Sequence, residues 1–494
     1  MSKLLNRIVL VSTIVTRVVA QNGADSMKSL KDTFSTIADI HAGKVPLGRV
    51  TVAGWLRTKR GSKKFSFLEL NDGTNSKTIQ VVADAVLPNY ESEIQKLTIG
   101  AAVCIEGELV ESKGQGQKYE IVAKNVEVYG FADPDTYPLQ KKEMTYEYLR
   151  EQAHFRPRTA TFAAMFRIRS RVSKFIHDFF EENGFYYAHT PIFTASDCEG
   201  GGNVFQVTTL PLEKIPRTPE GKVNYSEDFF GTPSFLTVSG QLEGELMALG
   251  LGKIYTFGPT FRAENSNTSR HLAEFWQIEP EMACWNLTDT IQRGQDLVCY
   301  CVRRFLEECN DDLDLVVARN GVDPRPWLRM TLEKPFVRVS YTEAVKILQE
   351  CGEKFEFPLG WGLDLQSEHE RYLCEKHFQS PTVVYDYPAD LKSFYMYMNE
   401  DGKTVHGADI LVPGVGEIVG SSQREHRYDV LIERMHKKGL REEDYSWYLA
   451  TRKFGTVPHA GFGLGLERLL MWMTGMGNIR DVVPFPRTPK NCLY

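Results

Sequence analysis

The chain of 494 residues carries 58 lysines and arginines against 64 aspartates and glutamates, a formal net charge of −6. With 42% hydrophobic and 25% charged residues it has the composition of a soluble globular protein of roughly two to four domains. This excludes a disordered chain, a collagen-like fibre and a protein with many membrane spans. Nucleic acid remains possible as a partner, provided that the positive charge for phosphate is gathered locally.

The first 24 residues differ from the rest of the chain. Lys3, Arg7 and Arg17 are their only charged side chains, and Asp25 is the first acid. At about 100° per residue these three bases fall on one side of a helix, with leucine, isoleucine and valine on the other. An amphipathic segment without acids is typical of an organelle presequence.

We therefore expect residues 1–27 to direct the chain to the mitochondrion, with residues 28–45 as a leader to the first domain. Two alternatives remain open at this point. A secretory signal would use the apolar run Ile8–Val15, although Arg17 interrupts it. Translation from Met27 would leave the protein in the cytoplasm. No later run of about 20 apolar residues predicts a membrane span.

The nine cysteines show no CxxC pair. Cys299 and Cys301 are the closest two, and on a helix this spacing points the thiols to different faces. We therefore expect neither a zinc site nor a disulfide framework, as is usual for thiols in a reducing compartment.

Residues 46–130 alternate between apolar and polar side chains, with turn residues between the short runs. Several short strands at this spacing predict a small closed barrel of the OB-fold type. The predicted strands are Val50–Leu56, Phe65–Leu70, Thr78–Val82, Val103–Leu109 and Tyr119–Val128. Residues 131–163 contain several prolines and mixed charge, and we expect them to form a hinge.

A larger α+β domain is predicted over residues 164–494. It opens with apolar residues at three- and four-residue spacing from Ile168 to Phe179, and Gly184 is expected to end this helix. Residues 211–235 are rich in proline, glycine and charge and indicate a surface insertion. Other predicted elements are strands at Ile254–Phe257 and Phe275–Glu279 and helices at 289–309, 341–351 and 365–378.

A compact basic segment lies between two predicted strands of the barrel. Residues 57–64 contain five bases, and Phe65 and Phe67 follow two residues apart, so that both face the same side of a strand. Bases beside strand-borne aromatic rings provide the phosphate neutralisation and base stacking that single-stranded RNA requires. The alternative is a solvated hairpin whose phenylalanines belong to the core.

Two segments of the larger domain indicate phosphate chemistry. In the first, Phe261–Glu264 and Arg270–Phe275 bracket a polar loop with arginine, histidine and glutamate. In the second, the glycine-rich run Gly461–Gly465 leads into a predicted helix from Leu466, and glycines permit close backbone approach. Arg468 then falls near a helix N-terminus, where an arginine gains nothing from the helix dipole. A phosphate or an adenine ring is the better explanation for it.

These segments resemble motifs 2 and 3 of the class II aminoacyl-tRNA synthetases, and the helix ending at Gly184 with the following Phe185–Pro191 resembles motif 1. A barrel before the catalytic domain is similar to the aspartate, asparagine and lysine subgroup. Phe261–Trp276 and Pro484–Pro489 resemble the asparaginyl-tRNA synthetases of the bacterial or organellar type. The resemblance covers the chain from about residue 45 and implies an antiparallel catalytic sheet flanked by helices.

The resemblance implies ATP-dependent ligation of L-asparagine to tRNA(Asn) through asparaginyl-adenylate. Arg262 would hold the α-phosphate and offset the charge that grows in the transition state. Arg270 and His271 would reach the β- and γ-phosphates, and Phe275 and Arg468 would enclose the adenine. The implied ATP-binding residues are Arg262, Glu264, Arg270, His271, Phe275, Glu417, Gly465 and Arg468.

Asp409 and Glu417 match the family's magnesium carboxylates, and hard oxygen ligands suit Mg²⁺. The sequence supports no protein nucleophile. The amino acid's carboxylate would attack the α-phosphate in line, releasing diphosphate, and the 3′-hydroxyl of the terminal adenosine of the tRNA would then take the aminoacyl group with release of AMP. Positioning and electrostatics from Arg262, Glu417 and Arg468 would supply the catalysis.

The segment 238–245 bears on which amino acid is used. Gln241 matches the family's contact to the α-amino group, and Gly244 stands where aspartate enzymes carry a lysine. Glu245 matches the reader of the asparagine amide in the asparagine enzymes; its carboxylate would accept from the amide and repel aspartate, while Arg424 would donate to the amide oxygen. Asp197, Glu199 and Gly200–Gly202 match a mobile loop that closes on the amino acid, where Glu199 would meet its ammonium group.

In the barrel, Phe67 and Gln80 match the subgroup's readers of the central anticodon base, Phe67 by stacking and Gln80 by hydrogen bonding. Arg57 and Lys59 of the basic segment are expected to bind the RNA nearby. The resemblance also implies a homodimer formed through motif 1, which the apolar helix 165–183 supports indirectly.

Two other functions compete with the ligase. An ATP-dependent asparagine synthetase could share the catalytic fold, but such paralogues lack the barrel. A non-catalytic RNA-binding paralogue would not need the Arg262, Glu417 and Arg468 that this chain retains.

Overall fold

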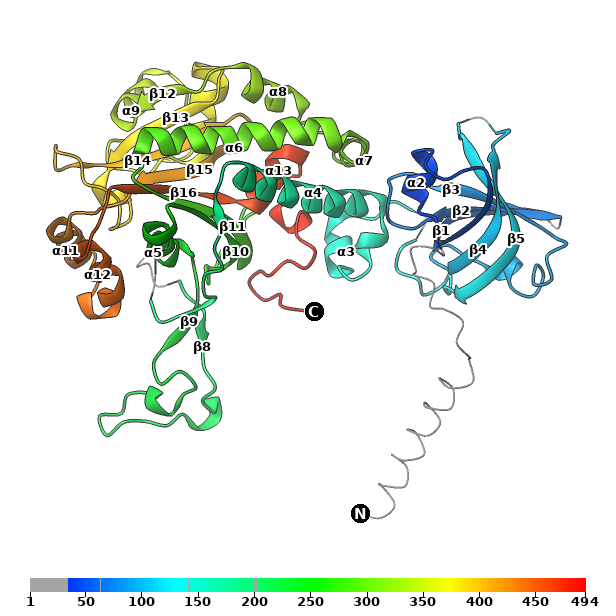
Figure 1. Cartoon of the computed structure of the whole chain (residues 1–494), viewed down its shortest axis with the longest axis horizontal. Helices are drawn as coiled ribbons and strands as arrows, with labels where there is room; N and C mark the ends of the chain where they lie inside the picture. Colours follow the sequence, from blue (N-terminus) through cyan, green and yellow to red (C-terminus); the bar gives the residue numbers. More distant parts are fainter. Residues whose placement is uncertain (1–33, 63, 115, 141, 197, 199–202) are drawn as a thin grey trace, which may run out of the picture. The chain divides into compact units, whose positions relative to one another are not determined.

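Two compact units make up the protein, each with its own hydrophobic core: one extends to Met144 and the other covers Thr145–Tyr494. The computed structural model describes residues 34–62, 64–114, 116–140, 142–196, 198 and 203–494 (Figure 1). The predicted presequence 1–27, Lys63 of the basic segment, and Asp197 and Glu199 of the predicted mobile loop lie outside the described residues.

The first unit is a closed five-stranded barrel with strands in the order β1-β2-β3-β5-β4. Strands β3 and β5 are parallel and the other pairs are antiparallel. Alternate side chains such as Val52, Leu68 and Val81 fill the interior, which confirms the predicted OB-fold architecture. Its elements are α2 (Ile37–His41), β1 (Gly48–Gly61), β2 (Phe65–Asn71), β3 (Ile79–Asp84), η2 (Ile94–Lys96), β4 (Ala102–Glu111) and β5 (Tyr119–Gly130).

The second unit is built on an eight-stranded sheet in the order β12-β13-β14-β15-β16-β11-β10-β6. Its pairs are antiparallel except β12–β13 and β6–β10, as predicted for the catalytic domain. The strands are β6 (Tyr186–Tyr187), β10 (Lys253–Phe261), β11 (Glu274–Ala283), β12 (Val337–Ser340), β13 (Thr382–Pro388), β14 (Thr404–Val412), β15 (Gly416–Gln423) and β16 (His459–Gly465).

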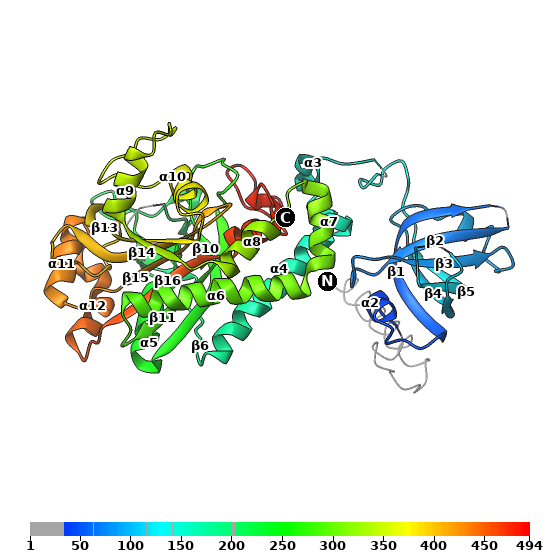
Figure 2. The same ribbon diagram turned by 90° about the horizontal axis from the view of Figure 1, so that it is seen from above.

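Helices α4 (Ala160–Glu182) and α6 (Leu287–Glu308) run side by side across one face of this sheet (Figure 1 and Figure 2). The main core lies between them and strand residues such as Ile278, Ile410 and Phe462. The remaining α-helices are α3 (Tyr146–Glu151), α5 (Gln241–Leu251), α7 (Asn310–Asn320), α8 (Arg325–Glu333), α9 (Tyr341–Glu350), α10 (Ser367–Arg371), α11 (Tyr428–Lys437), α12 (Ser446–Lys453) and α13 (Leu466–Thr474). None of the helices in the described ranges is both long and apolar enough to cross a bilayer.

Helix α4 begins earlier than the sequence pattern predicts. Thr159 caps it, its hydroxyl accepting from the backbone N–H of Phe162, and Gly184 (φ +72°) ends the segment as expected. The predicted hinge 131–163 is correspondingly divided, because residues from Thr145 onward belong to the second unit. Arg150 pairs with Asp481 at 2.5 Å, which ties α3 to the C-terminal part of that unit.

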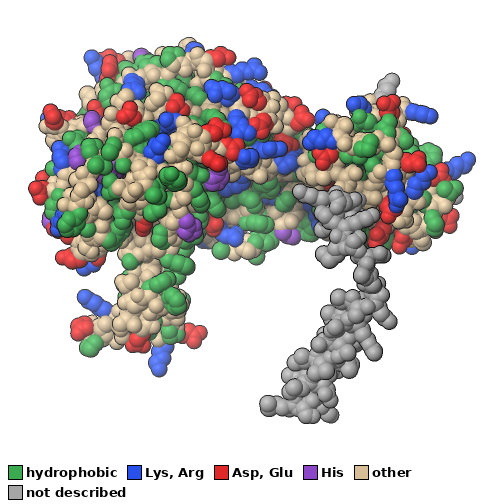
Figure 3. All heavy atoms as spheres, in the orientation of Figure 1, with side chains coloured by type: hydrophobic (Ala, Val, Ile, Leu, Met, Phe, Trp, Pro, Cys, Tyr) green, Lys and Arg blue, Asp and Glu red, His purple; other side chains and the backbone are tan. Residues whose placement is uncertain are grey.

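The predicted insertion forms an arm that stands clear of the rest of the second unit (Figure 1 and Figure 3). Its base is a three-stranded sheet in the order β7-β9-β8, with β7 at Phe193–Thr194, β8 at Gln206–Val207 and β9 at Ser234–Leu236. The Asp228 carboxylate holds the arm together by accepting hydrogen bonds from both Thr208 and Thr209. Phe229 remains 76% exposed.

Candidate active site

The wall of the site is a row of alternating side chains on β11. Because successive strand residues point to opposite faces, Ile278 enters the core while Phe275, Gln277 and Glu279 face the other side of the sheet. There they line a pocket of about 600 Å³. The pocket brings together most of the predicted site residues: Gln241, Arg262, Glu264, Arg270, His271, Phe275, Asp409, Glu417, Arg424, Gly465 and Arg468.

The segment between β10 and β11 supplies one wall of this pocket. The Arg262 guanidinium lies over the Phe275 ring, 5.3 Å from its centre, so the residues predicted for the α-phosphate and for adenine are neighbours. His271 Nε2 lies 3.6 Å from Glu264 Oε2. Burial and the positive charge of Arg468 lower the pKa of Arg270. Cations thus gather where the sequence predicts the triphosphate.

Arg468 is placed by the first turn of α13, as the sequence predicts. Its Nη1 lies 3.0 Å from Glu417 Oε2 and also donates to the Glu417 backbone carbonyl. The Glu417 carboxylate is the main reason that the pKa of Arg468 is raised. The next residue back, Glu467, is buried and accepts from the Trp276 backbone N–H, which fixes the start of α13 against β11.

Asp409 on β14 and Glu417 on β15 lie beside each other, as expected for a metal pair. An added Cβ at Gly420 would come within 3.1 Å of Glu417 Oε1 and 3.5 Å of Asp409 Oδ1, so these two oxygens converge over that glycine. Two carboxylate oxygens over an open backbone position fit Mg²⁺ completed by phosphate oxygens. Within the described ranges no group of three or more His, Cys, Asp or Glu side chains could hold a metal alone.

The amino-acid end of the pocket lies at the start of α5. Gln241 Nε2 donates to Glu245 Oε1 at 3.0 Å, and Glu279 accepts from the Gly240 backbone N–H at 3.0 Å and from the hydroxyls of Ser239 and Thr256. Sequence reasoning missed Glu279. Its position two residues after Gln277 and four after Phe275, in the same alternating row, was the available signal.

Glu245 lies behind the pocket wall, fully buried, and does not line the pocket. Besides Gln241, its carboxylate contacts the Tyr448 hydroxyl at 2.7 Å, His459 Nε2 at 3.1 Å and the Arg452 guanidinium. Burial alone would raise the pKa of Glu245, but Arg452 and His459 hold it well below its usual range.

The prediction that Glu245 reads the substrate amide stays a prediction; in this structure its oxygens accept hydrogen bonds from protein groups. The side chains that reach the pocket from this network are Gln241 and Arg424. Arg424 Nε lies 3.8 Å from Glu245 Oε1 and 3.1 Å from Glu281 Oε2. Glu245 is thus a direct neighbour of both residues, at 3.0 Å from Gln241 Nε2 and 3.8 Å from Arg424 Nε.

On the barrel, Phe65 and Phe67 project from the outer face of β2, with ring centres 5.1 Å apart. The strand neighbour Gln80 also faces outward and donates to Glu120 at 3.1 Å. The alternative of core phenylalanines is therefore wrong: the core positions of β2 are Ser66, Leu68 and Leu70. Arg57 donates to Asn71 at 3.2 Å.

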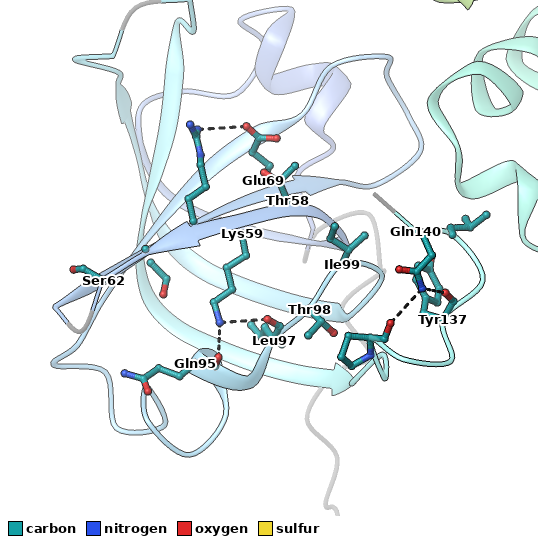
Figure 4. A pocket seen from close by; sticks show the side chains of 15 residues that line it. Thr58, Lys59, Ser62, Glu69, Gln95, Leu97, Thr98, Ile99, Tyr137 and Gln140 are labelled. Carbon is teal, nitrogen blue, oxygen red and sulfur yellow. Dashed lines mark hydrogen bonds and ion pairs between the residues drawn. The ribbon is translucent and has the colours of Figure 1, made fainter. Parts of the chain in front are cut away.

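Lys59 differs from the other bases of its segment (Figure 4). Its ammonium donates to the backbone carbonyls of Gln95 and Leu97, which Figure 4 draws, and of Ile94, all around the short helix η2. Lys59 pairs with the buried Leu68 across the strands, whereas Arg60 pairs with the outward Phe67, so alternation turns Lys59 inward. Burial lowers the pKa of Lys59. Its three protons serve the barrel, which differs from the predicted RNA contact.

A closed nucleic-acid-type barrel followed by an antiparallel sheet with a polar, cation-lined pocket defines a class II synthetase architecture. Comparison with sequence families agrees. The description "tRNA synthetases class II (D, K and N)" fits residues 144–489, and "OB-fold nucleic acid binding domain" fits residues 50–129. The chain belongs to the class II tRNA synthetases of this D, K and N group.

The curated relatives match almost the whole chain, across both units. The asparagine–tRNA ligase of Porphyromonas gingivalis W83 is 53% identical over 462 residues, which span 93% of this chain and 98% of the relative. That of Oleidesulfovibrio alaskensis is 55% identical over 455 residues, 92% and 98% of the two chains.

Solved structures agree with these relatives. Asparaginyl-tRNA synthetase from Pyrococcus horikoshii, complexed with asparaginyl-adenylate, matches with a TM-score of 0.80 and 31% identity, covering 95% of this chain and 100% of the other. The Entamoeba histolytica enzyme in complex with asparaginyl-adenylate matches with a TM-score of 0.76 and 26% identity, covering 91% and 98%.

Proposed function

We propose that this enzyme ligates L-asparagine to tRNA(Asn) in two steps, through asparaginyl-adenylate, for protein synthesis. ATP and asparagine form the adenylate and diphosphate, and the tRNA then takes the asparaginyl group with release of AMP. The observation that carries the proposal is the single pocket in which the predicted nucleotide residues and the amino-acid residues Gln241 and Arg424 face the same space.

In the first step the pocket positions the reacting groups. Glu279 and Gln241, which line the pocket, would hold the α-amino group of the substrate, and Arg424 would donate to its side-chain oxygen. Arg262 and Arg468 line the same pocket and would offset the charge that develops on the α-phosphate as the substrate carboxylate attacks it. This chemistry needs no protein nucleophile, because orientation and fixed charges lower the barrier.

Asp409 and Glu417 are the residues that would hold Mg²⁺, through the oxygens that converge over Gly420. A bound Mg²⁺ would neutralise phosphate charge and orient the triphosphate. Arg270 and His271 supply further positive or hydrogen-bonding groups on the same side of the pocket.

The barrel is assigned to the anticodon. The exposed Phe65 and the half-buried Phe67 offer an aromatic platform, with Gln80 beside it for hydrogen bonding and Arg60 to meet phosphate. Stacking on such rings is worth about 1–3 kcal/mol per base. The −6 net charge therefore does not prevent RNA binding, because the contacts are local.

The proposed homodimer would use the motif 1 region. Tyr186 and Tyr187 form the terminal strand β6 of the large sheet and are 62% and 52% exposed. Exposed aromatics on a sheet edge support pairing with a second copy. Sedimentation analysis of the wild type and of Tyr186→Lys would test this, since a monomeric wild type would contradict it.

The mitochondrial destination rests on the acid-free amphipathic pattern of residues 1–24. Fluorescent fusions with and without residues 1–27 would test it. Mitochondrial signal from the full chain and cytoplasmic signal from the shortened one are expected, and identical distributions would contradict the proposal.

The decisive activity test is ATP–diphosphate exchange with L-asparagine and with L-aspartate. We expect exchange with asparagine alone, and exchange with aspartate alone would contradict the proposed function. Arg262→Ala should abolish exchange while changing tRNA affinity much less. Formation of free asparagine from aspartate and ammonia would instead favour the asparagine synthetase alternative.

A further inference from the structure

Lys392 places a buried cation in the nucleotide pocket that none of the roles above uses. It follows β13 and the short helix η7 (Ala389–Leu391), and its side chain is only 18% exposed. The ammonium lies 2.8 Å from Asp409 Oδ2 and 3.9 Å from the centre of the Tyr387 ring. Tyr387 is itself buried, so the ammonium is held between an aromatic face and a carboxylate.

The two candidate metal ligands share one pattern. Asp409 directs Oδ2 to Lys392, and Glu417 directs Oε2 to Arg468 at 3.0 Å. The second oxygen of each lies over Gly420, at the predicted metal position. Each carboxylate thus faces a protein cation with one oxygen and the metal position with the other.

This pairing has an electrostatic consequence for the nucleotide-free enzyme. Asp409 and Glu417 each have a cation within ion-pair distance, so a divalent ion would meet two carboxylates whose negative charge is already partly offset. A triphosphate brings several further negative charges to the same place, and these can balance both the metal ion and the protein cations.

We propose that Lys392 makes divalent-metal binding at Asp409 and Glu417 conditional on the nucleotide. Lys392 acts through Asp409 and is therefore a positioning residue. Without ATP its ammonium opposes a divalent ion at the neighbouring oxygens; with ATP the phosphate charge removes that opposition. The inference rests on the proposed Mg²⁺ site.

A purely structural role predicts the opposite response to mutation. If Lys392 only held Asp409 in the correct rotamer, a neutral side chain would let the carboxylate turn away and metal binding would weaken. If Lys392 acts by its charge, a neutral side chain would strengthen metal binding in the absence of nucleotide. The sign of the change therefore separates the two roles.

The test uses the full-length enzyme without asparagine, so that no turnover occurs. Mn²⁺ binding is titrated by electron paramagnetic resonance of the free ion, with and without α,β-methylene-ATP, which cannot be cleaved at the reacting bond. The Mn²⁺ that the analogue binds in a protein-free titration is subtracted. Wild type should bind Mn²⁺ weakly alone and much more tightly with the analogue. Lys392→Met should bind Mn²⁺ at least about tenfold more tightly than wild type without nucleotide, so that the gain from the analogue shrinks.

Three further variants control the test. Lys392→Arg keeps the charge and should behave as wild type. Lys437→Met removes a lysine that is 68% exposed on α11 and should also leave binding unchanged. Lys392→Gln is a second neutral variant, used if thermal unfolding shows that the methionine variant does not fold.

Each outcome decides between the proposals. Unchanged or weaker nucleotide-free binding in the neutral variants, while wild type still binds Mn²⁺ with the analogue, overturns the role of Lys392 alone. An arginine variant that binds like the methionine variant does the same. If wild type binds no Mn²⁺ even with the analogue, the metal site at Asp409 and Glu417 is wrong and this inference falls with it.

Discussion

Arg424 and Glu281 form a buried ion pair at the amino-acid end of the pocket, with Arg424 Nε 3.1 Å from Glu281 Oε2. Arg424 can thus donate to a ligand in the pocket, while Glu281 already balances the positive charge of its guanidinium. An arginine in this state suits a neutral amide better than a carboxylate, which would prefer an unbalanced cation.

We predict from this pair that Glu281→Gln lowers the preference for asparagine over aspartate. Loss of the balancing charge should favour a carboxylate substrate, by about tenfold or more in the ratio of exchange rates, or about 1.4 kcal/mol. Exchange measured with both amino acids checks it. Glu433→Gln, at an exposed position on α11, is the control and should not alter the ratio. An unchanged ratio in Glu281→Gln would show that this charge does not set the selectivity.

The Glu281 carboxylate also leaves no room for a side chain at Gly461 on β16. A Cβ there would lie 2.3 Å from the carboxyl carbon of Glu281, while a Cβ on Gly258 of β10 would meet nothing within 4 Å. Gly461→Ala should therefore displace Glu281, lower the free energy of unfolding by about 1–3 kcal/mol and reduce exchange. Gly258→Ala is the matched control. Equal melting temperatures for the two variants would contradict the steric argument.

Lys59 and Arg60 are adjacent bases with different expected roles. Lys59→Met removes the donor to three carbonyls around η2 and should destabilise the barrel by about 1–3 kcal/mol. The salt dependence of tRNA binding should stay as in wild type. Arg60→Met, whose side chain is 69% exposed, should leave stability unchanged but reduce the slope of log affinity against log salt by roughly one.

Affinity titrations at several salt concentrations, together with thermal unfolding, check this pair of variants. A reduced salt slope in Lys59→Met with normal stability would return Lys59 to the predicted RNA contact.

Asp228 should control the order of the arm in a pH-dependent way. Hydrogen bonds from Thr208, Thr209 and the Phe229 backbone N–H hold its pKa well below the usual range. The stabilisation is therefore present above the unfolded-state pKa of about 3.9 and is lost as the pH falls through the lower folded-state value.

Asp228→Asn should accordingly speed proteolytic cleavage within the arm at pH 7, and wild type should approach the variant only in strong acid. Asparagine-dependent exchange should be unchanged, because the arm does not line the pocket. Glu213→Gln, at an exposed arm position, is the control. Equal cleavage rates for Asp228→Asn and wild type at pH 7 would contradict this prediction.

The barrel and the strand positions around the pocket could be predicted from the sequence because they depend on alternation. Alternation also predicts that Phe65 and Phe67 share the outward face of their strand. The helix start at Leu466 follows from another local signal, the glycine-rich run before it. Lys59 departs from the prediction that the bases of the segment 57–64 meet RNA, because its pairing with Leu68 turns it inward.

Other features depend on long-range packing that no local pattern contains. Glu245 meets Tyr448, Arg452 and His459, which lie more than 200 residues away in the chain. The convergence of Asp409 and Glu417 over Gly420 depends on the pairing of β14 with β15. The alternation along β11 could have predicted that Glu279 faces the pocket. Its hydrogen-bond partners Ser239 and Gly240 could not be predicted, because they lie about 40 residues earlier in the chain.

The separation of the barrel core from the main core of the second unit has a calorimetric consequence. A protein with one core around Val52 and Leu68 and another around Ile278 and Phe462 contains two cooperative units and can melt in two transitions. Because the pocket is lined entirely by residues of the second unit, ATP and asparagine would raise that transition alone. An anticodon oligonucleotide would raise the melting temperature of the barrel instead. Each group of ligands would therefore shift a different transition.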